Sequence, residues 1–287
     1  MAFFTLKGFR CFTPAVFLFL FFIFLSSPCG ATSTLFYVQD AKAAGMAMAV
    51  SSSIDNPSAV LYNPAMLPYQ KGFGFSQTQN FVVQRTTFSS DKTGNTWDVK
   101  GDTKRVPAFF VKYTADNLSL GIGMFSLFGM GITWPSAWDG RYAGFLADLN
   151  AVHINPVIAY RVNDYLSLGF GISYVTSSFV QKAALNFGMA GDGIVRLDGD
   201  GQAYGFNLGA TLKLPDAYTL SLTYRSPVTV DYDGKAKFSV PGPLTARFQN
   251  GPISTRINFP YLATLGLAKK FDKLTLETDL RLTGWSS

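Results

Sequence analysis

Residues 218–232 read YTLSLTYRSPVTVDY. Apolar side chains occupy nearly all the even positions from Tyr218 to Tyr232, whereas the odd positions carry polar side chains or proline. A period of two over this length indicates a β-strand, because successive side chains of a strand point to opposite faces. We therefore expect one strand whose even positions form a single apolar face.

The same alternation recurs at residues 152–161, 204–214 and 274–282. These stretches run about 10 to 15 residues, whereas strands of soluble proteins usually have about 5 or 6. Their polar faces carry Glu, Asp, Arg and Lys beside Gly, which suits a wet lumen better than a packed core. The pattern predicts an all-β protein, a transmembrane antiparallel β-barrel of the outer-membrane type.

Short turns divide the alternating stretches at regular intervals. Three turns are followed by similar strand openings, Leu-Ser-Leu at residues 118–120, 166–168 and 220–222. The spacings between the turn aspartates are 48, 52 and 56 residues. The four predicted turns are Ala115-Asp116-Asn117, Asn163-Asp164-Tyr165, Pro215-Asp216-Ala217 and Phe271-Asp272-Lys273. Tight turns that alternate with longer loops are typical of an outer-membrane barrel.

One segment has an alternative interpretation. Residues 117–138 contain no charged side chain over 22 positions, a length that suits a transmembrane helix. The segment nevertheless contains four glycines and Pro135, and it alternates from Leu118 to Met124. We predict barrel wall here, with allowance for an irregularity at residues 125–131.

Composition excludes several classes of protein. The chain has 287 residues, of which 48% are hydrophobic and 15% charged, and this content argues against disorder. The net charge is +6, or +4 once Lys7 and Arg10 are set aside, and no basic cluster indicates nucleic-acid binding. Two Cys and one His exclude a disulfide scaffold and a site with several His or Cys ligands. We expect no metal and no cofactor.

Catalysis is not expected either. Nucleophilic hydrolysis needs a nucleophile positioned by a base, and the only histidine, His153, lies within a strand without a nucleophile-bearing turn motif near it. We therefore predict no catalytic residues.

The N-terminus has the order of a secretory signal. Lys7 and Arg10 precede an apolar run from Phe12 to Leu25, and small residues follow up to Ala31. We predict a signal peptide at residues 1–31 that is cleaved after Ala31. A lipoprotein signal with Cys29 as the lipidated residue is the alternative, but Ser26-Ser27-Pro28 before it fits that motif poorly.

Three groups of motifs carry a family resemblance. The first lies after the signal, the second spans residues 138–164, and the third lies in the last third of the chain. They read Ala44-Gly45-Met46-Ala47-Met48-Ala49, Asp55-Asn56-Pro57-Ser58-Ala59-Val60 and Asn63-Pro64-Ala65-Met66-Leu67; Trp138-Asp139-Gly140-Arg141-Tyr142 and residues 155–164; and residues 204–209, 224–228 and 283–286. In this order and spacing, the chain resembles the FadL/TodX family of outer-membrane transporters for hydrophobic compounds.

The resemblance implies a 14-stranded barrel plugged by an N-terminal hatch. We assign residues 32–70 to the hatch and residues 71–287 to the barrel. About nine strands are counted here, so roughly five further strands are expected, because single-chain bacterial barrels have even strand numbers and an open sheet leaves its edges unsatisfied in lipid. Met66 stands where the resemblance implies Gly after Asn-Pro-Ala.

The resemblance also implies a function. We expect a monomeric protein in the outer membrane of a Gram-negative bacterium, surrounded by outer-membrane lipid, that admits hydrophobic molecules by passive diffusion with a sideways exit into the membrane. Long-chain fatty acids are the expected substrates. The alternatives are aromatic hydrocarbons and a general aqueous porin. The apolar, motif-bearing residues 42–67 argue against the porin.

The candidate substrate-binding or gating residues fall into two groups. Asn63, Pro64 and Ala65 are expected to form a hatch turn near the binding pocket, although an ordinary Asn-Pro turn has the same pattern. Glycines at lumen-facing positions such as Gly121 and Gly169 either give the hatch room or relieve crowding in a curved wall.

The second group lies in or near a long loop. Trp138 and Tyr142 are expected to form an apolar entry surface, with Arg141 attracting a carboxylate. The alternative is a loop that packs on the rim, with Arg141 in a salt bridge. Lys182, near the extracellular end of a strand, lies where the family's carboxylate-binding basic residue is expected, or else faces lipid headgroups.

Overall fold

The structure is a computed structural model that describes residues 35–285. The predicted signal peptide, residues 1–31, lies outside the described residues, as do residues 32–34 of the predicted hatch and Ser286 of the last motif. The described part contains short helices, none of which is long and apolar enough to cross a membrane.

Strands dominate the described chain. The helical elements are α2 (Ala41–Gly45), α3 (Ala59–Tyr62), η1 (Pro64–Tyr69), η2 (Gly188–Ala190), η3 (Pro215–Ala217) and η4 (Gly242–Leu244). The strands are β1 (Gly72–Val83), β2 (Thr87–Ser89), β3 (Thr96–Asp98), β4 (Thr103–Ala115), β5 (Leu118–Thr133), β6 (Leu146–Arg161), β7 (Leu166–Asn186), β8 (Asp192–Lys213), β9 (Tyr218–Arg225), β10 (Val228–Ser239), β11 (Gly251–Phe259), β12 (Tyr261–Phe271) and β13 (Leu274–Gly284).

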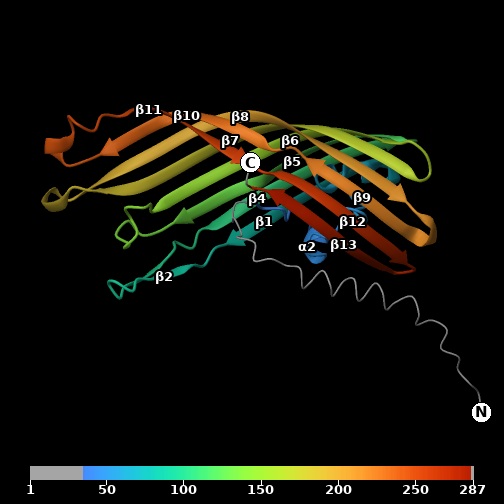
Figure 1. The fold of residues 1–287 in the computed structure, drawn as a ribbon, viewed down its shortest axis with the longest axis horizontal. Coiled ribbons are helices and arrows are strands. Elements are labelled where there is room, and N and C mark those ends of the chain that lie inside the picture. Colours follow the sequence, from blue (N-terminus) through green and yellow to red (C-terminus); the bar gives the residue numbers. More distant parts are fainter. Residues whose placement is uncertain (1–34, 286–287) are drawn as a thin grey trace, which may run out of the picture. The chain divides into compact units, whose positions relative to one another are not determined.

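Eleven strands form one curled antiparallel sheet (Figure 1). Its order is β1-β4-β5-β6-β7-β8-β9-β12-β13, and β10 and β11 extend the sheet beside β8. The chain runs from β9 into β10 and from β11 into β12 with only short interruptions, so each pair is one interrupted wall strand. This gives nine wall strands in the described residues, as the sequence predicted. The prediction of an antiparallel outer-membrane β-fold is confirmed.

The predicted turns are also confirmed. All four connect neighbouring antiparallel strands at the same end of the sheet, and β2 and β3 form a separate hairpin at the other end, which carries the long loops (Figure 1). Residues 118–133 of the uncharged segment form β5 and no helix. The register of β5 against β6 shifts between Ser126 and Phe128, inside the stretch where an irregularity was expected.

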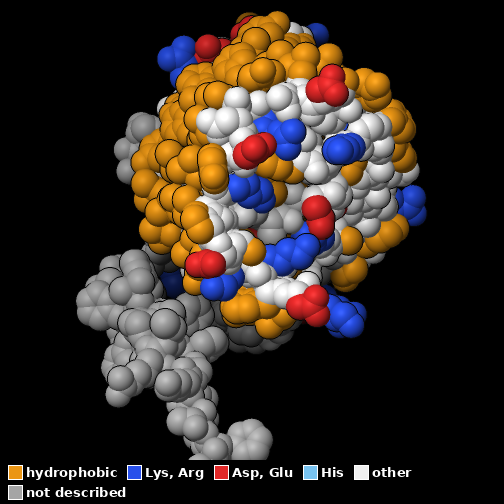
Figure 2. Space-filling model, turned by 90° about the vertical axis from the view of Figure 1, so that its right-hand side faces the viewer, with side chains coloured by type: hydrophobic (Ala, Val, Ile, Leu, Met, Phe, Trp, Pro, Cys, Tyr) orange, Lys and Arg blue, Asp and Glu red, His pale blue; other side chains and the backbone are white. Residues whose placement is uncertain are grey.

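The alternation places apolar side chains on the outer face of the sheet. Leu168, Phe170 and Ile172 of β7 are between 42% and 50% exposed, whereas Ser167 and Ser173, just before and just after this run, are buried. Viewed from the end with the short turns, hydrophobic side chains form much of the rim and charged side chains gather inside it (Figure 2). The outer face therefore has the composition of a wall in contact with lipid.

The expectation of one continuous apolar face over residues 218–232 is wrong. Leu222 points outward and is 57% exposed, but Val230 and Tyr232 are buried on the inner face. The pairing of β9 with β12 and the pairing of β10 with β11 have the same register, with Arg225 opposite Leu262 in the first and Val228 opposite Phe259 in the second. That register sets Pro227 opposite Pro260. Proline lacks the N–H that a ladder requires, so both strands break at this level and continue in the opposite phase.

Residues 35–70, called the N-terminal segment below, pack on the inner face of the sheet. Most of the large buried cluster comes from this segment and from β4–β7 and β10. Two wall glycines leave space for it: a Cβ on Gly121 would lie 2.8 Å from Val60, and one on Gly169 would lie 2.7 Å from the backbone of Pro64. These glycines therefore give the segment room, whereas Gly205 contacts Ser226 and Val228 instead.

Candidate functional site

The predicted site residues do not form one site. Asn63, Pro64 and Ala65 lie against Gly169 and Gly209, near the short turns. Lys182 lies thirteen residues further along β7 than Gly169, or about 43 Å at 3.3 Å per residue. Trp138, Arg141 and Tyr142 lie near Lys182, since the loop of residues 134–145 pairs with β7 through two backbone bonds.

Asn63 is the N-cap of η1 and is fully buried. Its Oδ1 accepts a hydrogen bond from the Ala65 N–H at 3.0 Å, which satisfies one of the free donors at the helix start. Its Nδ2 donates to the Ser51 carbonyl at 2.6 Å and to Thr211 Oγ1 of β8 at 2.9 Å. Asn63 thus joins two parts of the N-terminal segment to the wall, while Pro64 reaches the pocket described below.

Trp138 packs inside the long loop. Its ring stacks on Trp134 at 4.5 Å between centroids and meets Phe88 of β2 edge-on at 5.5 Å. Its indole N–H donates to the Gly144 carbonyl at 3.0 Å. Both ends of this side chain are therefore engaged, and together with Val99 and Phe145 it forms part of a small apolar cluster at the long-loop end.

Arg141 is paired with a carboxylate of the chain itself. Its Nε donates to Asp192 Oδ2 at 2.8 Å, and the Tyr142 hydroxyl donates to Asp192 Oδ1 at 2.9 Å. The hydrogen bond to Asp192 raises the pKa of Arg141 above its usual value. This arrangement matches the alternative interpretation of the sequence, in which the loop packs on the rim and Arg141 forms a salt bridge. Binding of a substrate carboxylate by Arg141 stays a prediction.

Lys182 lies in a row of cations on the outer face. It is directly opposite Arg196 of β8, which is in turn opposite Lys237 of β10. Asp198 lies between the latter two, 2.9 Å from Arg196 Nε and 3.4 Å from Lys237 Nζ. The strand phase directs Lys182 away from the inner face, as expected for the alternative of a rim residue. Its role in binding stays a prediction.

A row of polar side chains crosses the inner face. Asn155 of β6 donates from Nδ2 to Asn207 Oδ1 of β8 at 2.9 Å, across the intervening strand β7. Gly171 of β7 makes this contact possible, because a Cβ there would lie 2.5 Å from Asn207 Oδ1. Arg225 of β9 is directly opposite Asn207 and continues the row.

Arg225 is buried, with 7% of its surface exposed. Its Nη1 donates to Ser173 Oγ at 2.9 Å, and its Nη2 donates at 3.3 Å to both Asn155 Oδ1 and the Leu61 carbonyl. None of the ion pairs formed within residues 35–285 involves Arg225. A buried charge without an opposite charge is unfavourable, so this position suits an incoming anion.

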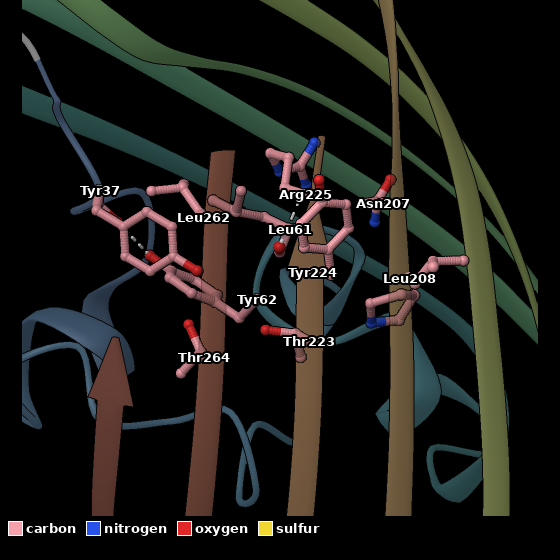
Figure 3. A pocket seen from close by; sticks show the side chains of 11 residues that line it. Tyr37, Leu61, Tyr62, Asn207, Leu208, Thr223, Tyr224, Arg225, Leu262 and Thr264 are labelled. Carbon is pink, nitrogen blue, oxygen red and sulfur yellow. Dashed lines mark hydrogen bonds between the residues drawn. The ribbon is translucent and has the colours of Figure 1, made fainter. Parts of the chain in front are cut away.

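A narrow pocket adjoins Arg225 (Figure 3). Its lining comes from both the N-terminal segment and the wall: Tyr37, Leu61, Tyr62, Pro64, Asn207, Leu208, Thr223, Tyr224, Arg225, Leu262 and Thr264. The Tyr62 hydroxyl donates to the Tyr37 carbonyl at 2.9 Å, and burial raises the pKa of Tyr62, which stays neutral. The pocket has room for about one water molecule, so a larger ligand requires the segment to shift.

The sequence analysis missed Arg225 as a functional candidate. The residue lies within a family-like motif, residues 224–228, and on the polar face of its strand. The signal that distinguishes it is the absence of a nearby acid, which depends on strand register and cannot be read from one strand. In the described part of the chain, no group of three or more His, Cys, Asp or Glu side chains is placed to hold a metal ion.

Comparison with known proteins agrees with this architecture. Outer membrane protein P1 of Haemophilus influenzae is 24% identical over 308 residues, which cover 90% of this chain and 67% of that protein. A long-chain fatty acid transport protein of Escherichia coli is 26% identical over 240 residues, which cover 73% of this chain and 54% of that protein.

Solved structures share the fold. A Pseudomonas aeruginosa FadL homologue matches with a TM-score of 0.75 at 21% identity, covering 89% of this chain and 70% of that one. The Pseudomonas putida toluene transporter TodX matches with a TM-score of 0.69 at 20% identity, covering 85% and 69%. Residues 25–287 match the family described as "Outer membrane protein transport protein (OMPP1/FadL/TodX)". The chain therefore belongs to this family of outer-membrane transport proteins.

Proposed function

We propose that the protein carries hydrophobic molecules bearing a carboxylate, most simply long-chain fatty acids, across the outer membrane by passive diffusion. Arg225 supports this proposal most directly, because it is a buried cation with no acidic partner in residues 35–285 and it lies beside a pocket. A carboxylate would supply the missing charge and form charge-assisted hydrogen bonds to the guanidinium.

The apolar part of the substrate has a matching surface. Leu61, Leu262 and the Tyr37 ring line the pocket, and Phe125 lies 5.4 Å from the Arg225 guanidinium. A ligand with a charged end at Arg225 would thus place its hydrocarbon part against apolar side chains. The relative from Escherichia coli is described as a long-chain fatty acid transport protein, which agrees with this substrate class.

Residues 32–70 act as the hatch in this proposal. The pocket is too small for a fatty acid, and four of its eleven lining residues belong to the N-terminal segment, so movement of that segment opens a path. The substrate then leaves sideways through the wall into the membrane, and the protein works as a monomer after removal of residues 1–31.

Aromatic hydrocarbons are the second candidate substrates. The rings of Tyr37 and Tyr62 meet edge-on at 5.2 Å beside the pocket, a surface that also suits a small aromatic molecule. TodX, which shares the fold, is described as a toluene transporter.

A liposome experiment separates these substrates. The purified protein is reconstituted, and entry of palmitate, of the neutral alcohol with the same chain, of toluene and of a small sugar is measured against empty liposomes. We expect palmitate to enter fastest. Preferential entry of toluene would support the aromatic alternative, and free passage of sugar would overturn hydrophobic transport in favour of a porin.

A further inference from the structure

The inner face of β13 contacts the N-terminal segment through charged side chains. Glu277, Asp279 and Arg281 alternate with the outward-facing Leu280 and Leu282, which are 59% and 58% exposed. The sequence pattern suggested that such charges line a wet lumen. Instead, each of the three binds the backbone of residues 48–52.

Two carboxylates receive three consecutive backbone N–H groups. The N–H groups of Val50 and Ser51 both donate to Asp279 Oδ2 at 3.1 Å, and the Ser51 hydroxyl donates to Oδ1 at 2.8 Å. The next N–H, that of Ser52, donates to Glu277 Oε1 at 2.6 Å. Charge-assisted hydrogen bonds of this kind are about twice as strong as neutral ones. Without β13 these buried donors would need other partners.

The backbone before these donors is in an unfavourable conformation. Ala47 and Met48 have φ values of 50° and 63°, a region that non-glycine residues rarely adopt. Arg281 Nη2 donates to the Met48 carbonyl at 3.1 Å, directly at this point. Such a conformation persists only where surrounding contacts hold it in place. The β13 side chains provide those contacts.

The neighbouring strand is shaped to admit this contact. A Cβ on Gly266 of β12 would collide with Ser51 Oγ and with Asp279 Oδ1. Arg281 also connects the contact to the pocket, because its guanidinium lies 3.9 Å from the centroid of the Tyr37 ring, which lines the pocket. One set of charges therefore holds residues 48–52 and adjoins the pocket wall.

We propose that Glu277, Asp279 and Arg281 are positioning residues that form a latch: they hold residues 48–52, and through them the N-terminal segment whose other residues line the pocket, in the closed position, and release of the latch opens the pocket. This inference rests on the proposed function, in which the N-terminal segment is the hatch. Glu277 Oε2 is buried and has no hydrogen-bond partner in the described structure, so the latch is not fully satisfied and is suited to release.

The latch is tested by the accessibility of a buried reporter. Ser52→Cys is suitable because Ser52 is 1% exposed and its hydroxyl makes no hydrogen bond in the described structure. A membrane-impermeant thiol reagent is applied to the reporter protein and to the same protein carrying Glu277→Gln and Asp279→Asn. The matched control carries Asp231→Asn, which removes an outward-facing carboxylate that pairs with Arg256. The chain without the reporter measures labelling of its own cysteines.

We expect labelling to become about tenfold faster in the double variant, because its neutral side chains form weaker hydrogen bonds to residues 50–52. The labelling rate of the control should stay unchanged. Equal rates in the double variant and its parent would overturn the latch. This readout needs no substrate, so it is independent of the proposed function. Asp279→Asn alone provides a milder variant if the double variant does not fold.

A cross-link provides the converse test. Ser51→Cys together with Asp279→Cys replaces a hydrogen-bonded pair of side chains across the contact, Ser51 Oγ and Asp279 Oδ1 at 2.8 Å, with two thiols. We expect palmitate entry to stop when the pair is oxidised and to return on reduction. If entry continues in the cross-linked protein, the latch is not a gate, although transport itself is established. If palmitate enters under neither condition while the unmodified chain also fails, the proposed function is wrong.

Discussion

Two arginines in two regions of the molecule have opposite environments. At the long-loop end, Arg141 is held by Asp192 in an exposed salt bridge. On the inner face, Arg225 is buried and is bonded only to neutral oxygens in the described structure. The loop arginine, which a sequence pattern marks as a carboxylate binder, already has its carboxylate. The wall arginine, which the pattern does not mark, lacks one.

This difference shows that a charged side chain without a counter-charge points to a binding site when it is buried. An exposed ion pair contributes little to stability and is readily exchanged with water and salt. A buried cation without a counter-charge is costly, so a buried arginine of this kind is a better candidate for binding an anion than a paired arginine on the surface. Changing each arginine in turn tests that distinction.

The largest effect is expected for Arg225→Gln. Loss of the charged donor should weaken palmitate binding by about 1.5–3 kcal/mol, or about 10- to 150-fold, because hydrogen bonds to charged groups contribute this much. Isothermal titration in detergent measures the affinity. The neutral alcohol with the same chain should bind both proteins equally.

Stability provides the second arm of the Arg225 comparison. Removing an isolated buried charge should leave the thermal unfolding midpoint unchanged or raise it. A large fall in the midpoint together with unchanged palmitate affinity would assign Arg225 a purely structural role and remove the main support for carboxylate binding.

A medium effect on stability is expected where the N-terminal segment packs against the wall. Gly169→Ala places a Cβ 2.7 Å from Ala65 N and from the Pro64 carbonyl carbon, and backbone cannot move away easily. We expect a loss of about 1–3 kcal/mol, as for other overpacked positions, seen as faster proteolysis of residues 35–70. Gly251→Ala in β11 is the matched control, since no atom lies within 4 Å of its Cβ. Equal proteolysis of both variants would contradict tight packing at Gly169.

The smallest effect is expected for Arg141→Gln. Its salt bridge to Asp192 is exposed, and such pairs contribute about 0–1 kcal/mol. Palmitate affinity, measured by the same titration, should therefore change by less than about fivefold. A loss as large as that of Arg225→Gln would reverse the comparison and place the carboxylate at the loop.

Much of the wall could be predicted from the sequence. The Asp-containing turns at residues 116, 164, 216 and 272 and the alternation between them determine where strands begin and which face meets lipid. Periodicity of this kind is local, so a single chain reveals it. The register shift in β5 between Ser126 and Phe128 lies within residues 125–131, the stretch for which the sequence analysis allowed an irregularity.

The remaining features depend on contacts between distant residues. The change of phase after Arg225 arises because Pro227 meets Pro260, 33 positions later, and neither proline alone indicates that they are opposite. In the same way, the carboxylates of β13 look like lumen lining until residues 50–52 are placed against them. Arg225 becomes a candidate for substrate binding only once the neighbouring strands are in place and none of their described acidic side chains pairs with it.

The facing prolines also have a mechanical consequence. A sheet resists bending where successive rungs of hydrogen bonds tie its strands together, and at the level of Pro227 and Pro260 neither residue has an N–H to contribute. The line between these two residues is therefore a crease, at which the wall is more compliant than above or below it. Thermal flexing should concentrate there, close to Arg225 and the pocket, and leave the hydrogen-bonded strands on either side comparatively rigid.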